Sequence, residues 1–405
     1  MKKISETQLK QILAGLPENP RVVASGNSAA PLNLLRIIDA ELESFKLHML
    51  NAPEGIPNRK GVTHETAFVG KGMRHSDMLN YIPCRLSMVP VLFKQHLVPD
   101  IVMIHTSALK ENTLSLGIEV NILPAAIESA RKHGAIVIAQ ANKQMPYTYG
   151  DAVLYEHDVD YYVEADEPLK TVATKNQTDL TKSIGERVAH YIPDSSTLQL
   201  GIGGIPDAVL QSLSNRKDLR LWTEMFTDGV LELYNKGSFN RDIPLTASFL
   251  FGTQELYNWV DHNHNVRMLR TEKTNDPATI ARHPLMMSVN SALQVDLLDQ
   301  ANASWVNGEI YSGFGGSTDF IVGALHSPQG HAFMALPSWH PKANVSTIIP
   351  KLVTPATSFQ HSAVITENGT AWCFGNDSKT QAKYLIEKAA HPDAREELRE
   401  SLNKY

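Results

Sequence analysis

Residues 197–209 read TLQLGIGGIPDAV, and this stretch decides the fold. Four residues with strand character run into a glycine-rich turn. Pro206 then lies at the start of a helix, where proline is tolerated. Strand, turn and helix in this order form the repeating unit of α/β proteins. The backbone N–H groups of such a turn can also stabilise an anion, because no side chain shields them.

The same alternation of short apolar strands and helices extends through the chain. The sequence predicts strands at 100–107 and 135–142 around a helix at 122–134, and later strands at 219–225, 247–253, 286–292, 332–338 and 363–369. These strands are apolar without a regular polar alternation, which is typical of parallel sheets covered on both faces.

A polar stretch at 164–182 interrupts the pattern and is interpreted as a linker. At about 100–200 residues per domain, a chain of 405 residues is expected to hold two domains. We therefore predict an N-terminal α/β domain at 1–180 and a C-terminal α/β domain at 181–405.

Composition restricts the class of protein. The chain is 42% hydrophobic and 20% charged, with a formal net charge of −6, which fits a globular protein and disfavours nucleic acid as a partner. No run approaches the roughly 18 apolar residues of a membrane span, and the first 20 residues lack the apolar core of a signal peptide. Two widely separated cysteines, Cys84 and Cys373, indicate a reducing compartment. We expect a cytoplasmic protein without a membrane partner.

Glu224 is the first candidate for chemistry. It lies in LRLWTEMFTDG (219–229), where a predicted strand breaks into a polar turn. The preceding turn has the pattern G-x-G-x-x-P, so that Glu224, about 20 residues further on, has the position of a ribose-binding acid in an NAD enzyme. A purely structural strand–helix turn is a second interpretation of the glycines. A third is that Glu224 is a nucleophile whose oxyanion is stabilised by glycine amides.

Other candidates lie in the second half of the chain. Asn290 ends an apolar run, a second glycine-rich turn spans 313–316, and Lys342 lies in a loop where it could meet a phosphate. The sixteen histidines show no metal-ligand spacing, and no serine lies in a G-x-S-x-G turn. Zinc and serine-nucleophile chemistry are therefore poorly supported, and no metal site is predicted.

Six segments together resemble the acetyl-CoA hydrolase/transferase group of family I CoA-transferases, and most of all its 4-hydroxybutyrate CoA-transferase branch. They are LQLGIGGIPDAV, TEMFTDGVLELYNKG, ASFLFGTQELYNWV, VNSALQVDL, YSGFGGSTDFIVGA and AHPDAREEL, in family-like order and spacing. In the first half, residues 106–121 resemble the family's Gly-Ser-Leu-Gly-type segment.

The resemblance implies a fold and a set of site residues. The fold would be two tandem open α/β domains of the NagB/RpiA/CoA-transferase type, with the acid substrate bound partly by the first. Glu224 would be the catalytic nucleophile and Asn290 an oxyanion or CoA contact. The CoA-binding residues would be Gln199, Gly201, Ile202, Gly203, Gly204, Ile205, Gly315, Gly316 and Lys342.

The resemblance also implies the reaction. The protein would move CoA from a short-chain acyl-CoA to acetate, butyrate, 4-hydroxybutyrate or a related acid through a glutamyl-CoA thioester. It would use CoA as a substrate, have no tightly bound cofactor, and assemble as a homodimer or larger homo-oligomer. Three alternatives stay open: an acyl-CoA hydrolase that uses the same glutamate, an NAD enzyme, and a non-catalytic CoA- or nucleotide-binding protein.

Overall fold

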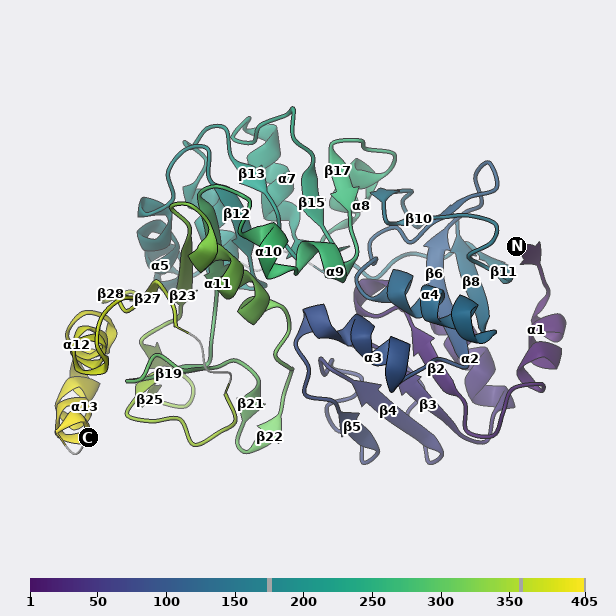
Figure 1. Ribbon diagram of the computed structural model, residues 1–405, viewed down its shortest axis with the longest axis horizontal. Coiled ribbons are helices and arrows are strands. Elements are labelled where there is room, and N and C mark those ends of the chain that lie inside the picture. The colour runs from purple at the N-terminus through teal and green to yellow at the C-terminus, as the bar shows by residue number, and fades with distance from the viewer. Residues whose placement is uncertain (173–176, 357–359, 404–405) are drawn as a thin grey trace. The chain divides into compact units, whose positions relative to one another are not determined.

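The structure is a computed structural model that describes residues 1–172, 177–356 and 360–403 (Figure 1). The chain divides into two compact units. Unit 1 consists of Met1–Ala173, Pro244–Thr274 and Ile310–Gly315, and unit 2 of Thr174–Ile243, Asn275–Glu309 and Gly316–Tyr405. Both units are built on parallel sheets, so that the predicted α/β class with two domains is confirmed.

Unit 1 contains an eight-stranded sheet in the order β1-β11-β8-β6-β2-β3-β4-β5, in which every neighbouring pair is parallel. Its strands are β1 Lys2–Lys3, β2 Arg21–Ala24, β3 Phe45–His48, β4 Val62–Thr66, β5 Leu79–Tyr81, β6 Ile101–Ser107, β8 Ile136–Asn142 and β11 Tyr161–Ala165. The main helices of this part are α1 Glu6–Leu13, α2 Leu32–Glu41, α3 Val89–Gln95 and α4 Leu123–His133.

The predicted strand–helix–strand unit at 100–142 is confirmed as β6, α4 and β8. β6 is buried along its whole length, as expected for a central parallel strand. α4 ends at Gly134, whose φ of 73° places it in the left-handed region that favours glycine at a helix C-terminus.

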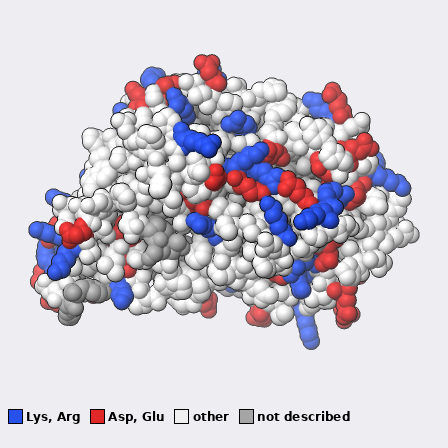
Figure 2. Space-filling view, in the orientation of Figure 1, with Lys and Arg blue, Asp and Glu red and all other residues white. Residues whose placement is uncertain are grey.

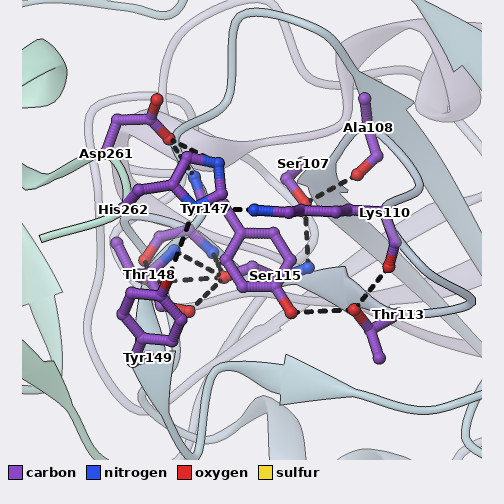
Figure 3. A network of polar contacts seen from close by, with 11 residues as sticks. Ser107, Ala108, Lys110, Thr113, Ser115, Tyr147, Thr148, Tyr149, Asp261 and His262 are labelled. Carbon is purple, nitrogen blue, oxygen red and sulfur yellow. Dashed lines mark hydrogen bonds and ion pairs between the residues drawn. The ribbon is translucent and has the colours of Figure 1, made fainter. Parts of the chain in front are cut away.

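The loop after β6 is fixed by its own hydroxyl groups (Figure 3). Ser107 Oγ accepts a hydrogen bond from the backbone N–H of Ser115, and Ser115 Oγ accepts one from that of Gly117. At the tip, the hydroxyls of Thr113 and Tyr147 lie 2.8 Å apart. The loop that contains the family-like segment is therefore an ordered part of unit 1.

Unit 2 contains a six-stranded sheet in the order β13-β12-β18-β23-β27-β28, in which only β28 is antiparallel to its neighbour. Its strands are β12 Thr197–Leu200, β13 Arg220–Leu221, β18 Met286–Asn290, β23 His331–Ala335, β27 Ala363–Thr366 and β28 Gly369–Trp372. Its helices include α5 Asp179–His190, α6 Gly204–Ser212, α7 Asp228–Asn235, α10 Pro277–Ile280, α11 Ser317–His326, α12 Ser378–Tyr384 and α13 Arg395–Leu402.

The compact units differ from the contiguous ranges 1–180 and 181–405. The strand expected at 247–253 in the second domain does not join the unit 2 sheet. Instead β15 (Leu245–Ala247) pairs with β17 (Val266–Met268), which pairs with β9 (Tyr149–Gly150) in unit 1. This long-range pairing groups 244–274 with unit 1. Of the linker expected at 164–182, residues 173–176 lie outside the described residues.

Charged groups of both signs are interspersed on the face drawn in Figure 2. In unit 1, Arg270 forms ion pairs with Glu128 and Glu272, and Lys273 pairs with Asp151 at 2.6 Å. Among the residues described, no helix is long and apolar enough to cross a membrane. Within the same residues, no cluster of three or more His, Cys, Asp or Glu could hold a metal ion.

Candidate active site

The candidate residues of unit 2 lie at the point in the sheet where the order of successive strands reverses. From β12 the chain passes through α6 to β13 on one side, and from β18 it passes through α11 to β23 on the other. β12 and β18 are parallel neighbours, so that their carboxyl ends meet at the point of reversal. Open α/β sheets bind ligands in the crevice at such a point.

Gln199 and Asn290 lie together at these strand ends, as two members of a buried amide cluster. Gln199 Oε1 accepts hydrogen bonds from Ser288 Oγ at 2.6 Å and from Asn290 Nδ2 at 3.2 Å. Asn290 Nδ2 also donates to Ser288 Oγ at 2.9 Å, and Gln199 Nε2 donates to Asn290 Oδ1 at 3.3 Å. Ser288, which sequence reasoning missed, joins both amides because it faces Gln199 in the strand register.

The glycine-rich turn follows directly from this cluster. The Gly201 N–H donates to Val289 O at 3.0 Å, and Ile202 is 53% exposed beyond it. Gly203 has a φ of +128°, a conformation that L side chains rarely adopt, and it caps α6 without a side-chain hydrogen bond. Gly204 and Ile205 begin the helix. The turn thus combines bare backbone with an uncapped helix N-terminus, as an anion site requires.

Glu224 lies in the break between β13 and β14 (Met225–Phe226), as the sequence predicted. Thr223 fixes this break, since its hydroxyl donates to Met225 O at 3.0 Å. Glu224 is half-buried. Asn275 Nδ2 donates a 2.9 Å hydrogen bond to its Oε2.

The surroundings of Glu224 change its acidity. Burial raises the pKa of Glu224 to about 7. The Asn275 hydrogen bond opposes this shift, and the nearby charge of Asp319 adds to it. Asp319 lies in the first turn of α11 and is fully buried. A carboxylate that titrates near neutrality marks a candidate functional group.

Gly316 is required by the position of Glu224. A Cβ at this position would lie 1.8 Å from Glu224 Oε2 and 2.1 Å from Asn275 Nδ2. Such distances are far below van der Waals contact, so that only glycine lets the start of α11 approach the carboxylate. The structure thus places Gly316 against Glu224, and its role in CoA binding stays a prediction.

Gly315 and Lys342 lie elsewhere. Gly315 belongs to unit 1, where its carbonyl accepts a hydrogen bond from Leu86 N at 2.8 Å. Lys342 is exposed in the loop between β24 (Trp339–His340) and β25 (Val345–Ser346). The structure therefore brings Gln199, Asn290 and the 201–205 turn together, joins Glu224 to Gly316, and leaves Lys342 at a hairpin tip.

Sequence reasoning missed Asn275 and Asp319 as well as Ser288. Asn275 precedes the Asp276–Pro277 start of α10, in which Asp276 caps the helix through Ala278 N and Thr279 N. The capping pattern Asp-Pro could have located the helix. It could not have located Glu224 as the partner of Asn275, because the two are 51 residues apart.

Comparisons with known proteins agree with this architecture. Residues 21–173 match the acetyl-CoA hydrolase/transferase N-terminal domain, and residues 252–402 match the C-terminal domain of the same name. The chain is 35% identical to 4-hydroxybutyrate coenzyme A transferase of Clostridium kluyveri over 98% of this chain and 96% of that one. An acetyl-CoA hydrolase of Yarrowia lipolytica is 31% identical over 58% of this chain and 45% of that one.

A solved structure gives the same result for the fold. The 4-hydroxybutyrate CoA-transferase of Porphyromonas gingivalis superposes with a TM-score of 0.83 at 31% identity, covering 100% of this chain and 97% of that one. Domain matches, a full-length relative and a full-length structural neighbour thus agree. The chain belongs to the acetyl-CoA hydrolase/transferase family.

Proposed function

We propose that this protein transfers CoA from a short-chain acyl-CoA to a carboxylic acid, and that Glu224 carries the CoA between the two as a thioester. The observation that carries the proposal is the setting of Glu224. A half-buried carboxylate with a pKa raised to about 7 is held by one amide and lies against a glycine that admits no side chain. A poorly solvated carboxylate is a stronger nucleophile than one in water.

The reaction balances without a net change in protons or electrons. Glu224 attacks the thioester carbonyl, the C–S bond breaks, and a mixed anhydride and CoA thiolate form. The thiolate attacks the glutamyl carbonyl of the anhydride, and the first acid leaves as a carboxylate. Glu224 then holds CoA as a thioester, and a second carboxylate carries out the same two steps in reverse.

The remaining roles follow from the charges that develop. One thioester replaces another, so that the overall reaction is close to isoenergetic and the protein must mainly stabilise transient oxyanions. The N–H groups of the 201–205 turn, with Gln199 and Asn290 at its base, are proposed to hold the CoA portion. Asn290 Nδ2 already donates hydrogen bonds to Gln199 and Ser288. We therefore infer that Asn290 gives up one of these two hydrogen bonds when it donates to the substrate.

The same glutamyl thioester could be resolved by water, which would make the protein an acyl-CoA hydrolase. A relative named as an acetyl-CoA hydrolase keeps this second candidate open. We favour transfer because the full-length relative is named as a transferase. Free thiol release from acetyl-CoA, measured with and without acetate or butyrate, separates the two. Equal thiol release in the absence of an acceptor acid would favour the hydrolase.

Intact-mass measurement tests the covalent step. Incubation of the protein with acetyl-CoA alone should add the mass of CoA to the chain, and borohydride should reduce the thioester and remove the adduct. Glu224→Gln should show neither change. An adduct of equal yield in Glu224→Gln would exclude this glutamate as the carrier.

Location and assembly are secondary proposals. We propose a cytoplasmic homodimer or larger homo-oligomer that binds no tightly held cofactor. Both cysteines are free thiols, Cys373 in the interior and Cys84 half-buried, as a reducing compartment would keep them. Light scattering coupled to gel filtration tests the assembly, and a monomer at micromolar concentration would contradict it.

A further inference from the structure

Glu224 lies in a short segment that is attached to the rest of unit 2 at both ends. The segment runs from Thr223, shortly after β13, to Thr227, the residue before α7. The side chain of Glu224 itself is held by one amide, that of Asn275. The place of this glutamate in the fold therefore depends on how the backbone of residues 223–227 is fixed.

Thr223 attaches the first end of the segment to β12. Its side chain is completely buried, and its hydroxyl oxygen lies 3.0 Å from Met225 O and 3.4 Å from both the N and the O of Leu200. A hydroxyl has one hydrogen, which we assign to the shorter bond, so that the oxygen is left to accept from the Leu200 N–H. Leu200 is the last residue of β12 and directly precedes the glycine turn. One hydroxyl thus joins this turn to the residues on both sides of Glu224.

Thr227 attaches the other end of the segment to α6. It is the N-cap residue of α7, where a threonine hydroxyl ordinarily accepts a hydrogen bond from the first turn of its own helix. Here the side chain makes no such cap. It donates instead to Asp207 Oδ1 at 3.1 Å, in the first turn of α6. The hydroxyl therefore joins two helices in place of capping one.

The two attachments reach both flanks of the glycine turn at 201–205. Leu200 precedes the turn, and Asp207 follows it in the helix that the turn begins. Asn275 and Gly316 act on the carboxylate of Glu224, whereas the two threonines act on the backbone that carries it. The backbone of the proposed nucleophile is thus fixed against the same turn that is proposed to hold CoA.

We propose that Thr223 and Thr227 are positioning residues, which hold Glu224 in the place from which it attacks the thioester. Both act through Glu224 and its neighbouring backbone. This inference rests on the proposed function, because it concerns the step in which Glu224 attacks acyl-CoA.

The test uses the full chain with acetyl-CoA as the probe. Thr223→Val keeps the branching of the side chain and removes the hydroxyl. The rate of CoA adduct formation at saturating acetyl-CoA should fall at least about tenfold, since a displacement of about 1 Å in a reacting group can cost about 10²-fold. The acetyl-CoA concentration that gives half the maximal rate should stay near the wild-type value, because the glycine turn itself is unchanged. Thr223→Ser restores the hydroxyl and should recover most of the rate.

Thr197→Val is the matched control. Thr197 is the first residue of β12, is also buried, and donates its hydroxyl hydrogen to Pro284 O at 3.1 Å. The change removes the same kind of hydrogen bond at the end of the strand away from the glycine turn. It should lower the melting temperature about as much as Thr223→Val does, while the adduct forms at nearly the wild-type rate. An equal loss of rate in these two variants would indicate a general structural effect and overturn the proposal.

Thr227→Val removes the second attachment and is measured in the same way, which provides a test even if Thr223→Val fails to fold. It should also slow adduct formation without changing the dependence on acetyl-CoA concentration, and Thr227→Ser should restore the rate. A wild-type rate in either folded valine variant, Thr223→Val or Thr227→Val, would overturn the proposal.

Adduct formation by the wild type separates this inference from the proposed function. If the wild type forms the CoA adduct and a folded valine variant at 223 or 227 forms it equally fast, the positioning role fails while the covalent mechanism is unaffected. If the wild type forms no adduct, the proposed function fails, and the step that the two threonines would support fails with it.

Discussion

In both large sheets the order of the strands reverses at one point, yet the residues at this point differ in chemistry between the two units. In unit 2 the turn after β12 is mostly bare backbone. Three of the five residues at 201–205 are glycine, and the side chain of Ile202 is exposed. In unit 1 the turn after β2 carries the buried polar side chains of Asn27 and Ser28. Topology thus gives each unit a point of reversal, and residue type decides which chemical groups lie there.

The polar side chains next to the two turns also differ in how they are hydrogen-bonded. Gln199, Ser288 and Asn290 satisfy one another, which makes a rigid base for the glycine turn. In unit 1, the side-chain amides of Gln140 and Asn142 lie 3.3 and 3.1 Å from His105 Nε2, and the backbone carbonyls of Ala29 and Ala30 lie beside the same ring. The side-chain network in unit 2 is thus closed on itself, whereas His105 in unit 1 lies between side-chain amides and backbone carbonyls.

The largest effect should separate the proposed nucleophile of unit 2 from a carboxylate of unit 1. Glu224→Gln should lower transfer by at least about 10⁴-fold, because the nucleophile is lost. Glu167→Gln, which removes a half-buried carboxylate of unit 1, should still form the CoA adduct. Intact mass and transfer rates of the two variants give the contrast. Comparable losses of adduct in both would show that the loss is not specific to Glu224.

Gly316→Ala should be next in size. The new Cβ would overlap both Glu224 Oε2 and Asn275 Nδ2, so that the carboxylate must move. A displacement of about 1 Å in a reacting group can cost about 10²-fold in rate. Single-turnover formation of the adduct at saturating acetyl-CoA measures this loss.

Gly201→Ala is the comparison for Gly316→Ala. Its Cβ would lie 3.7 Å from Asn290 Oδ1, an ordinary contact. It should form the adduct at saturating acetyl-CoA at nearly the wild-type rate, with any loss confined to KM. A slower adduct step in Gly201→Ala than in Gly316→Ala would contradict the proposed distinction between the two glycines.

The pH dependence of adduct formation should show how Asn275 and Asp319 affect the pKa of Glu224. The reactive form is the ionised carboxylate, so that the rate should fall as pH drops through about 7. Asn275→Ala removes a hydrogen bond that lowers the pKa of Glu224 and should move this fall upward by about one pH unit. Asp319→Asn removes a like charge and should move it downward.

Opposite shifts distinguish direct effects on Glu224 from a general loss of structure, which would lower the rate at every pH. Melting temperatures of both variants at one pH provide the control for folding. Shifts of the same sign in Asn275→Ala and Asp319→Asn would show that neither acts through the charge of Glu224.

Much of this arrangement follows from local sequence. The run 100–142 predicts β6, α4 and β8, because buried parallel strands and a glycine-terminated helix are encoded by neighbouring residues. Glu224 could be located because a strand break is visible locally. The assignment of 244–274 to unit 1 could not be foreseen, since the pairing edge for β17 is β9, and the paired residues Arg267 and Tyr149 are 118 positions apart.

Contacts between distant side chains were equally hidden. Asn275 meets Glu224, and His105 meets Gln140 and Asn142, only because separate strands and loops converge. The residue type alone favours a local role for each, as a loop amide or a core histidine. Their importance follows from the partners that folding brings to them.

The smallest effect concerns Lys342. The resemblance assigns it to CoA binding, and its exposed position at a hairpin tip leaves it able to meet a phosphate. Lys342→Ala should raise the KM for acetyl-CoA about two- to fivefold without changing kcat or stability, because an exposed ion pair contributes up to about 1 kcal/mol. The effect should shrink as salt is added, since a solvated pair is screened.

Lys351→Ala is its control. Lys351 is also an exposed lysine of unit 2, nine residues further along the chain. A general loss of positive charge would raise the KM equally in both variants, whereas a specific phosphate contact would raise it only in Lys342→Ala. Equal effects would leave the glycine turn after β12 as the proposed anion site of unit 2, and the contrast between bare backbone in unit 2 and buried polar side chains in unit 1 would become sharper.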